Sequence, residues 1–370
     1  MISKFINSVL LWVKNMWVKI IRLLFGYNPD NGTGAGSVDA AVNYGDFKLV
    51  RAEKDVIGVG CHRTGWPWVF GYLSTIESKN GIIFDDFFEQ NFCYTPNPVI
   101  YKEPWITIIH HPKSIPSFGN YKENLSAVFE MDAFKESSKE LKLVVALSDE
   151  LAVWLRTQLD CKVVSLKHPI DVDQPNEWDY DAWCKNKTSY QIGFYLRNTR
   201  LIEQIPNVEG VEFNRLWSDM DWLQIYDGKV SKYWDNLFKS SFDFRDKNYF
   251  NARYKYREAG DHSVKFALPS KYDEILRTSV VLVEYFECSA SNVILECIAG
   301  NTPIIVNRLP STVQYLGEDY PLFFDSPEEI PDLYNKIEEA NLYLKALDKR
   351  DINIEGFMKN ILKEVNQIKK

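Results

Sequence analysis

The chain has 370 residues, more than one compact core usually holds, and this length predicts at least two domains. Hydrophobic residues make up 45% and charged residues 25% of the chain, which excludes a disordered protein, a collagen-like repeat and a multi-span membrane protein. The net charge of −8 argues against a protein that coats nucleic acid. Six scattered cysteines without a Cys-x-x-Cys pair indicate reduced thiols of a cytosolic protein.

The first 26 residues differ from this average composition. Apolar residues recur in residues 1–26 at helical spacing, and the segment has four basic residues and no acidic one. Its longest uncharged run is Phe5–Val13, far shorter than the roughly 18–20 residues of a membrane-spanning helix. The segment therefore predicts a basic amphipathic helix that lies on a membrane surface with anionic lipids. Docking of this helix on the body of the protein or on a second subunit is the alternative.

Residues 27–45 are rich in Gly, Asn and Asp and predict a flexible linker. Their Gly-Thr-Gly-Ala-Gly run is not predicted to bind phosphate as a dinucleotide fingerprint, because no apolar strand leads into it.

From residue 46 onward, short apolar segments alternate with helical segments, which is typical of parallel α/β sheets. The first series predicts strands at 55–61, 81–84, 99–101, 105–110, 143–147 and 162–166, and helices at 66–78, 125–139 and 149–159. The second series predicts strands at 190–195, 211–217, 264–268, 280–284, 302–306 and 322–324, and helices at 271–277, 292–300 and 328–345.

Two such series of about equal size imply two Rossmann-like domains that face each other across a cleft. We expect them in residues 46–185 and 186–350, followed by a terminal helix in residues 351–370. The alternation breaks down in the polar segment 174–188, and the two domains are expected to join near residue 185, with His168-Pro169 marking the crossing of the chain. Ser148 is the expected N-cap of the helix at 149–159.

The strongest indication of a ligand lies after the strand at 280–284. A polar loop there leads into a helix that is expected to open at Ser289–Asn292. The first amides of a helix have no intrahelical partner and lie at the positive end of its dipole. This turn therefore predicts a diphosphate site that includes the hydroxyls of Ser289 and Ser291 and the side-chain amide of Asn292.

Glu296 lies one turn further along this helix, on the same face as Asn292. A carboxylate there can accept hydrogen bonds from two ribose hydroxyls. The alternative is that the serines merely cap the helix and that Glu296 lies on its solvated face. Gly300 is the expected C-cap.

The order of strand, polar loop, Glu-bearing helix, glycine turn, Thr-Pro and strand in this part of the chain resembles the donor-binding segment of GT-B glycosyltransferases. The resemblance is carried by NVILECIAGNTPIIV. It implies a nucleotide-sugar held by the C-terminal domain, with Glu296 at the position that binds the ribose. Family-4-type retaining members usually carry two glutamates with seven residues between them. Here eight residues separate Glu287 from Glu296, and Cys288 stands at the expected position, so both stereochemical outcomes stay open.

The resemblance also concerns the loop after the first strand of the second domain. Gly193 follows that strand, with Arg197 and Arg200 behind it. GT-B enzymes often place a basic residue of this loop on the donor diphosphate where other glycosyltransferases use a metal, which implies Arg197 as a phosphate contact and no metal cofactor. A surface ion pair of this loop is the alternative. Arg308 follows a later strand and is expected at the same edge, because ligands bind at the carboxyl ends of parallel strands.

Candidate bases lie at strand ends of the first domain. His62 and His110 end two predicted strands, and a histidine with a near-neutral pKa suits the removal of a proton from an acceptor hydroxyl. Asp85 follows another strand and is a rival base. For each of them a structural hydrogen bond is the alternative. No third ligand stands near these histidines at metal spacing, so no metal site is predicted.

Together, these features and the resemblance imply a metal-independent glycosyltransferase. It is expected to transfer a sugar from a nucleoside-diphosphate sugar to a glycan or lipid-linked acceptor, as in polysaccharide biosynthesis. Residues 1–26 would hold it peripherally at the cytoplasmic face of the membrane. A nucleotide-sugar 2-epimerase of the same fold and a non-catalytic scaffold that binds a nucleotide-sugar are the alternatives.

Overall fold

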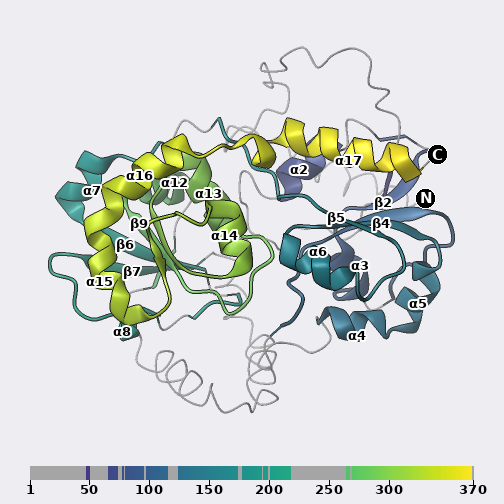
Figure 1. Cartoon of the computed structure of the whole chain (residues 1–370), viewed down its shortest axis with the longest axis horizontal. Helices are drawn as coiled ribbons and strands as arrows, with labels where there is room; N and C mark the ends of the chain where they lie inside the picture. The colour runs from purple at the N-terminus through teal and green to yellow at the C-terminus, as the bar shows by residue number, and fades with distance from the viewer. Residues whose placement is uncertain are drawn as a thin grey trace, which may run out of the picture. The chain divides into compact units, whose positions relative to one another are not determined.

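Figure 1 shows the computed structural model of the chain. It describes the following residues: 47–50, 66–73, 77–78, 80–95, 97–115, 124–173, 177–193, 195–198, 201–217, 264–266 and 269–368. The predicted amphipathic helix at 1–26, the linker at 27–45, the strand at 55–61 with His62, and Arg200 lie outside the described residues.

The first half of the described chain forms a sheet in which all neighbouring strands are parallel, in the order β1-β2-β3-β4-β5. The strands are β1 (Phe47–Val50), β2 (Ile82–Asp85), β3 (Trp105–Ile109), β4 (Leu141–Ala146) and β5 (Lys162–Ser165). The helices are α2 (Trp66–Leu73), α3 (Phe88–Phe92), α4 (Leu125–Phe129), α5 (Asp132–Ser138) and α6 (Asp149–Leu155). All of β3 is buried, as expected for a parallel strand covered on both faces.

The expected cap of α6 is present, because the Ser148 hydroxyl accepts a hydrogen bond from the Leu151 amide at 3.3 Å.

The predictions of a helix at 125–139 and of a strand at 99–101 were wrong. The predicted helix is divided into α4 and α5, since Met131 has the extended conformation with φ −68° and ψ 137°. This break lets the Phe129 ring stack on Phe134 with 4.9 Å between centroids.

The predicted strand at 99–101 does not form, because the Asn91 side chain makes hydrogen bonds with both backbone groups of Val99. Its amide nitrogen donates to the Val99 carbonyl at 3.1 Å, and its oxygen accepts from the Val99 amide at 2.8 Å. The two backbone groups that a neighbouring strand would need are thereby taken up.

The second half forms another wholly parallel sheet, in the order β11-β10-β9-β6-β7-β8. The strands are β6 (Thr188–Ile192), β7 (Glu212–Trp217), β8 (Val264–Phe266), β9 (Val280–Val283), β10 (Ile304–Asn307) and β11 (Phe323–Phe324). The helices are α7 (Tyr180–Asn186), α8 (Leu201–Gln204), α12 (Pro269–Thr278), α13 (Asn292–Gly300), α14 (Pro310–Leu316), α15 (Ile330–Leu333), α16 (Ile337–Ala346) and α17 (Ile354–Ile368). Three short 3₁₀ turns are η5 (Pro327–Glu329), η6 (Tyr334–Lys336) and η7 (Arg350–Ile352).

Three expectations for this half are corrected. The predicted helix at 328–345 is interrupted, with two 3₁₀ turns and two short helices in its place. Gly300 is the last residue of α13, and the C-cap is Asn301, whose φ of 55° is in the left-handed region that asparagine tolerates. The polar segment 174–188 contains α7, which begins at Asp179, where the carboxylate accepts from the Ala182 amide at 2.9 Å.

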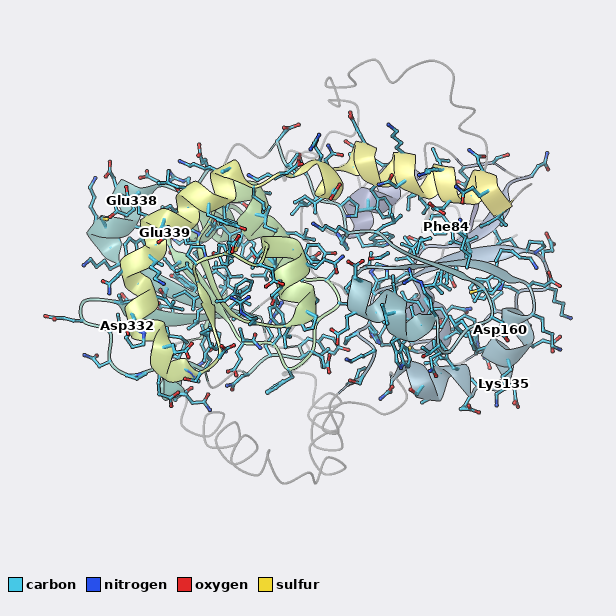
Figure 2. The ribbon with its side chains drawn as sticks, in the orientation of Figure 1. Phe84, Lys135, Asp160, Asp332, Glu338 and Glu339 are labelled. Carbon is cyan, nitrogen blue, oxygen red and sulfur yellow. The ribbon has the colours of Figure 1, made fainter. Side chains whose placement is uncertain are left out.

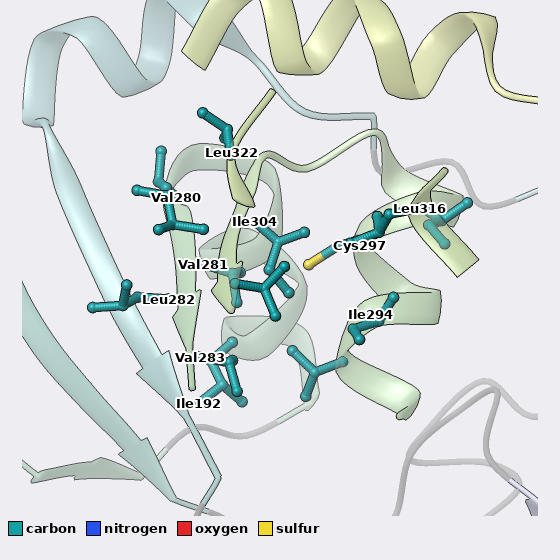
Figure 3. Packing of buried hydrophobic residues seen from close by; sticks show 14 of the residues in the cluster. Ile192, Val280, Val281, Leu282, Val283, Ile294, Cys297, Ile304, Leu316 and Leu322 are labelled. Carbon is teal, nitrogen blue, oxygen red and sulfur yellow. The ribbon is translucent and has the colours of Figure 1, made fainter. Parts of the chain in front are cut away.

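The core of this half surrounds β9. Val280, Val281, Leu282 and Val283 are all 0% exposed, and Figure 3 shows Val281 close to Cys297 of α13 and Ile304 of β10. Figure 2 shows the contrast between Phe84, which is buried in β2, and the exposed Lys135, Asp160, Asp332, Glu338 and Glu339. The predicted α/β class with parallel sheets is confirmed. Over the described part of the chain, no helix combines the length and the apolar character that crossing a membrane requires.

The strand order of the second sheet indicates where a candidate ligand site lies. From β6 the chain continues to β7 and β8 on one side, and then returns to β9, β10 and β11 on the other. The direction of winding therefore reverses between β6 and β9. In parallel α/β sheets, ligands bind outside the carboxyl ends of the two strands at such a reversal.

Candidate functional site

Hydrogen bonds join the loops that follow β6 and β9. The Asn198 side chain donates to Glu284 Oε2 at 2.6 Å, and the Asn198 backbone amide donates to the Glu284 carbonyl at 2.9 Å. Arg197, which precedes Asn198, forms an antiparallel backbone bridge with Tyr285, which follows Glu284. The two loops at the reversal are therefore held together as one unit.

Arg197 and Gly193 come together in the first of these loops. Gly193 has a φ of +73°, and a Cβ atom built on it would lie 1.7 Å from Nη1 of Arg197. The guanidinium Nη2 is 3.5 Å from Ser291 Oγ, and Cζ is 5.2 Å from the centre of the Tyr285 ring. The positive φ of residue 193 favours glycine, and a side chain there would have to displace the guanidinium of Arg197.

The guanidinium lies at the beginning of α13. Ser291 is the N-cap of this helix, but its side chain makes no capping hydrogen bond. The Ser291 hydroxyl instead lies 2.5 Å from the Tyr285 hydroxyl. Ser289 is 2% exposed, and its hydroxyl oxygen has no hydrogen-bond partner among the residues that the structure describes. The first turn of α13, which begins at Asn292, thus combines uncapped amides with serine hydroxyls and a positive side chain.

Glu296 lies one turn further along α13 and is 8% exposed. Its Oε2 accepts a hydrogen bond from the Tyr272 hydroxyl of α12 at 2.5 Å. Burial and the charge of Glu296 raise the pKa of Tyr272 well above its usual value, while the charge of Arg197 acts in the opposite direction. The electrostatic influence of Arg197 therefore extends along α13 to this point. The alternative of a solvated Glu296 was wrong, since the residue is buried.

Arg308 follows β10 but makes its described contacts elsewhere. Its Nη1 pairs with Glu318 Oε2 at 3.2 Å, and its Cζ lies 4.5 Å from the centre of the Phe323 ring. Its predicted role as a phosphate contact stays a prediction.

His110 lies among aromatic rings at the end of β3. Its Nε2 is 3.1 Å from the Asp86 carbonyl oxygen, and its ring centre is 4.5 Å from the centres of both Trp66 and Phe87. Burial, together with His168, lowers the pKa of His110 to about 3. This value differs from the near-neutral pKa that was expected of a general base.

Asp85 is the other described candidate base. It is 4% exposed and accepts hydrogen bonds from the Tyr101 hydroxyl at 2.8 Å and from the Phe87 amide at 3.2 Å. Burial raises the pKa of Asp85 to about 7; the Tyr101 bond opposes this shift and Asp86 adds to it. The pKa suits a base at neutral pH, although both carboxylate oxygens accept structural hydrogen bonds.

Over the described ranges, no group of three or more His, Cys, Asp and Glu side chains is placed to hold a metal ion. That the reaction needs no metal and no cofactor stays a prediction.

Comparison with known proteins gives matches among solved structures. No protein-family model and no curated protein matches the chain. One similar structure is a UDP-forming α,α-trehalose-phosphate synthase from Burkholderia vietnamiensis, with 10% identity, a TM-score of 0.45, and coverage of 72% of this chain and 67% of that chain. Another is the trehalose-6-phosphate synthase OtsA, with 10% identity, a TM-score of 0.48, and coverage of 82% and 77%. HepE of Anabaena in complex with UDP-glucose has 11% identity, a TM-score of 0.45, and coverage of 72% and 71%. A likeness of this size transfers none of these activities to the chain.

Three residues that lie near the predicted sites were not recognised as site residues in the sequence analysis. Tyr285 and Tyr272 contact Ser291 and Glu296, respectively. Glu89 is 0% exposed, and its Oε1 accepts the backbone amides of His110 and His111 at 2.8 and 2.7 Å. Tyr285 follows the strand at 280–284 directly, and this position was a usable signal. Tyr272 and Glu89 are brought to their partners only by tertiary packing.

Proposed function

We propose that the chain is a glycosyltransferase that transfers a sugar from a nucleoside-diphosphate sugar to a glycan or lipid-linked acceptor. The observation that carries this proposal is the position of the Arg197 guanidinium at the opening turn of α13, 3.5 Å from Ser291 Oγ. A cation placed at the positive end of a helix dipole is unfavourable by itself. The arrangement becomes favourable when an anion accepts hydrogen bonds from both.

A nucleotide-sugar fits this anion site better than a single phosphate does. Glu296 lies one turn beyond the opening of α13 and is buried against Tyr272. Its carboxylate can accept hydrogen bonds from the ribose hydroxyls of a nucleotide whose diphosphate lies at the helix opening. The likeness of NVILECIAGNTPIIV to the GT-B donor segment supports the same orientation. The guanidinium and the helix amides would then stabilise the diphosphate leaving group without a metal.

In this proposal, residues 186–350 form the donor domain and residues 46–185 the acceptor domain. Among the candidate bases, Asp85 has a pKa of about 7, which suits proton removal from an acceptor hydroxyl. His110 and His62 stay candidates for the same step.

A panel of nucleotide-sugars tests the proposed function. The purified chain is incubated with UDP-, GDP- and dTDP-sugars, and thermal shift, hydrolysis and transfer to lipid-linked glycans are measured. If the chain is a glycosyltransferase, one donor should raise its melting temperature, and the sugar of that donor should be transferred. Interconversion of the donor sugar would indicate a 2-epimerase, and binding without turnover a scaffold; either result would contradict the proposed reaction.

Glu296→Gln is expected to lower the affinity for the preferred nucleoside diphosphate by about 10-fold, because an amide has one acceptor oxygen in place of two charged ones. The same substitution should leave the affinity for the 2′,3′-dideoxy nucleotide unchanged. Isothermal titration calorimetry measures both affinities, with the exposed Glu339→Gln as the matched control. An equal loss for both nucleotides would contradict the ribose contact.

We also propose that residues 1–26 hold the protein peripherally at the cytoplasmic membrane face. In a flotation experiment with anionic vesicles, the full-length chain should be recovered with the vesicles at the top of the gradient. A chain without residues 1–26 should stay at the bottom. Equal flotation of the two chains would contradict this anchor.

A further inference from the structure

Tyr285 lies two residues after the end of β9 and is held in a defined position. It is 4% exposed. Its backbone amide donates to Asn307 Oδ1 at 2.8 Å, and its carbonyl accepts from Asn307 Nδ2 at 2.9 Å. A single side chain at the end of β10 thus holds both backbone groups of Tyr285. The phenol therefore has a defined position between Arg197 and α13, with its hydroxyl 2.5 Å from Ser291 Oγ.

This position changes what Ser291 does at the beginning of α13. An N-cap serine usually accepts a hydrogen bond from the second or third amide of its helix, which stabilises the helix. Ser291 makes no such bond. Its oxygen lies instead at hydrogen-bond distance from the Tyr285 hydroxyl, with the Arg197 Nη2 at 3.5 Å. The amides of the first turn of α13 consequently keep no side-chain cap.

The possible donors at this turn follow from their chemistry. A guanidinium can only donate, and Nη2 of Arg197 lies 3.5 Å from Ser291 Oγ. Burial raises the pKa of Tyr285 to about 12, although the charge of Arg197 acts in the opposite direction, so the phenol is protonated at neutral pH. Either hydroxyl of the Tyr285–Ser291 pair can be the donor, and when the phenol donates, the hydrogen of the Ser291 hydroxyl is available to an anion. Ser289 is 2% exposed, and its hydroxyl has no hydrogen-bond partner among the described residues.

We propose that Tyr285 is a positioning residue for the donor diphosphate. Its hydroxyl holds the Ser291 hydroxyl away from the cap of α13, and its ring supports the Arg197 guanidinium from 5.2 Å. Amides, hydroxyl and guanidinium are thereby arranged for phosphate oxygens before the ligand arrives. This role rests on the proposed function of the site.

Tyr285→Phe separates this role from a merely structural one. The variant keeps the ring beside Arg197, but the Ser291 hydroxyl is released and can cap α13. We expect the affinity for the tightest-binding of UDP, GDP and dTDP to fall by about 5- to 10-fold. The melting temperature should stay equal or rise, because the helix gains its cap. A lower melting temperature with unchanged affinity would overturn the proposal.

A double-mutant cycle adds a second measurement. Ser291→Ala and Tyr285→Phe should each weaken binding by about 5- to 10-fold, and the double variant should lose no more than either single one, since both remove the same arrangement. Losses that multiply would overturn the coupling. If the unaltered chain binds none of the three nucleotides, the proposed function fails and the role of Tyr285 falls with it. If the unaltered chain binds one and Tyr285→Phe binds it equally well, only the role of Tyr285 fails.

Discussion

Arg197→Gln is expected to lower the affinity for a nucleoside diphosphate by about 30- to 100-fold, which corresponds to about 2–3 kcal/mol. The physical reason is the loss of charge-assisted hydrogen bonds from a planar fork that matches phosphate oxygens. The guanidinium lies beside Ser291 at the beginning of α13. Isothermal titration calorimetry at constant salt measures the loss.

Two variants make this result specific. Arg277→Gln removes the same charge from an exposed residue in the last turn of α12, which lies before the start of β9. It should leave the affinity unchanged. Gly193→Ala keeps the charge of Arg197 but would place a Cβ 1.7 Å from its Nη1, so it should weaken binding by displacing the guanidinium. If Arg197→Gln and Arg277→Gln had the same small effect, the phosphate role of Arg197 would be lost.

Asp85→Asn is expected to stabilise the fold increasingly as the pH rises. The folded chain holds the pKa of Asp85 at about 7 against 3.8 for an ordinary aspartate, mainly because of burial. Between these values the folded state binds more protons than the unfolded state, so the contribution of Asp85 to stability falls as the pH rises through this window. By pH 8 the loss reaches about 4 kcal/mol, at 1.36 kcal/mol per pKa unit. An asparagine avoids this loss.

Urea denaturation of both chains from pH 4.5 to 8 measures this difference in unfolding free energy. His110 titrates with the opposite sign, because a pKa lowered to about 3 makes its contribution fall as the pH falls. This contribution is present in both chains and cancels in the difference. Asp160→Asn, at an exposed aspartate, is the matched control. A flat profile for Asp85→Asn would show that the carboxyl titrates normally.

The parallel strands could be predicted from sequence because buried strands leave continuous apolar runs. VVLV of β9 and WITII of β3 are such runs, and both are fully buried. Helix α13 could be predicted with its bounds, since a polar turn precedes it and a strand follows closely. Helix α7 could not, because its polar segment is held by tertiary contacts. Its neighbour Trp178 donates from Nε1 to the Ser279 carbonyl at 2.9 Å, and Trp183 is 6% exposed.

The candidate site was predictable in part. Gly193 and Arg197 could be proposed separately from their place after a strand, but their direct contact depends on a φ of +73° and on the fold of the loop. The partner of Glu296 is Tyr272, from another helix, and no local pattern connects the two. The pKa values of His110 and Asp85 depend on burial, which strand-end position alone does not give.

The decisive measurement is a structure of the protein determined with its preferred nucleoside diphosphate. We expect the diphosphate oxygens within hydrogen-bond distance of the Arg197 guanidinium and of the amides that open α13, with the ribose hydroxyls at Glu296. A nucleotide bound elsewhere, with Arg197 and α13 untouched, would contradict this expectation.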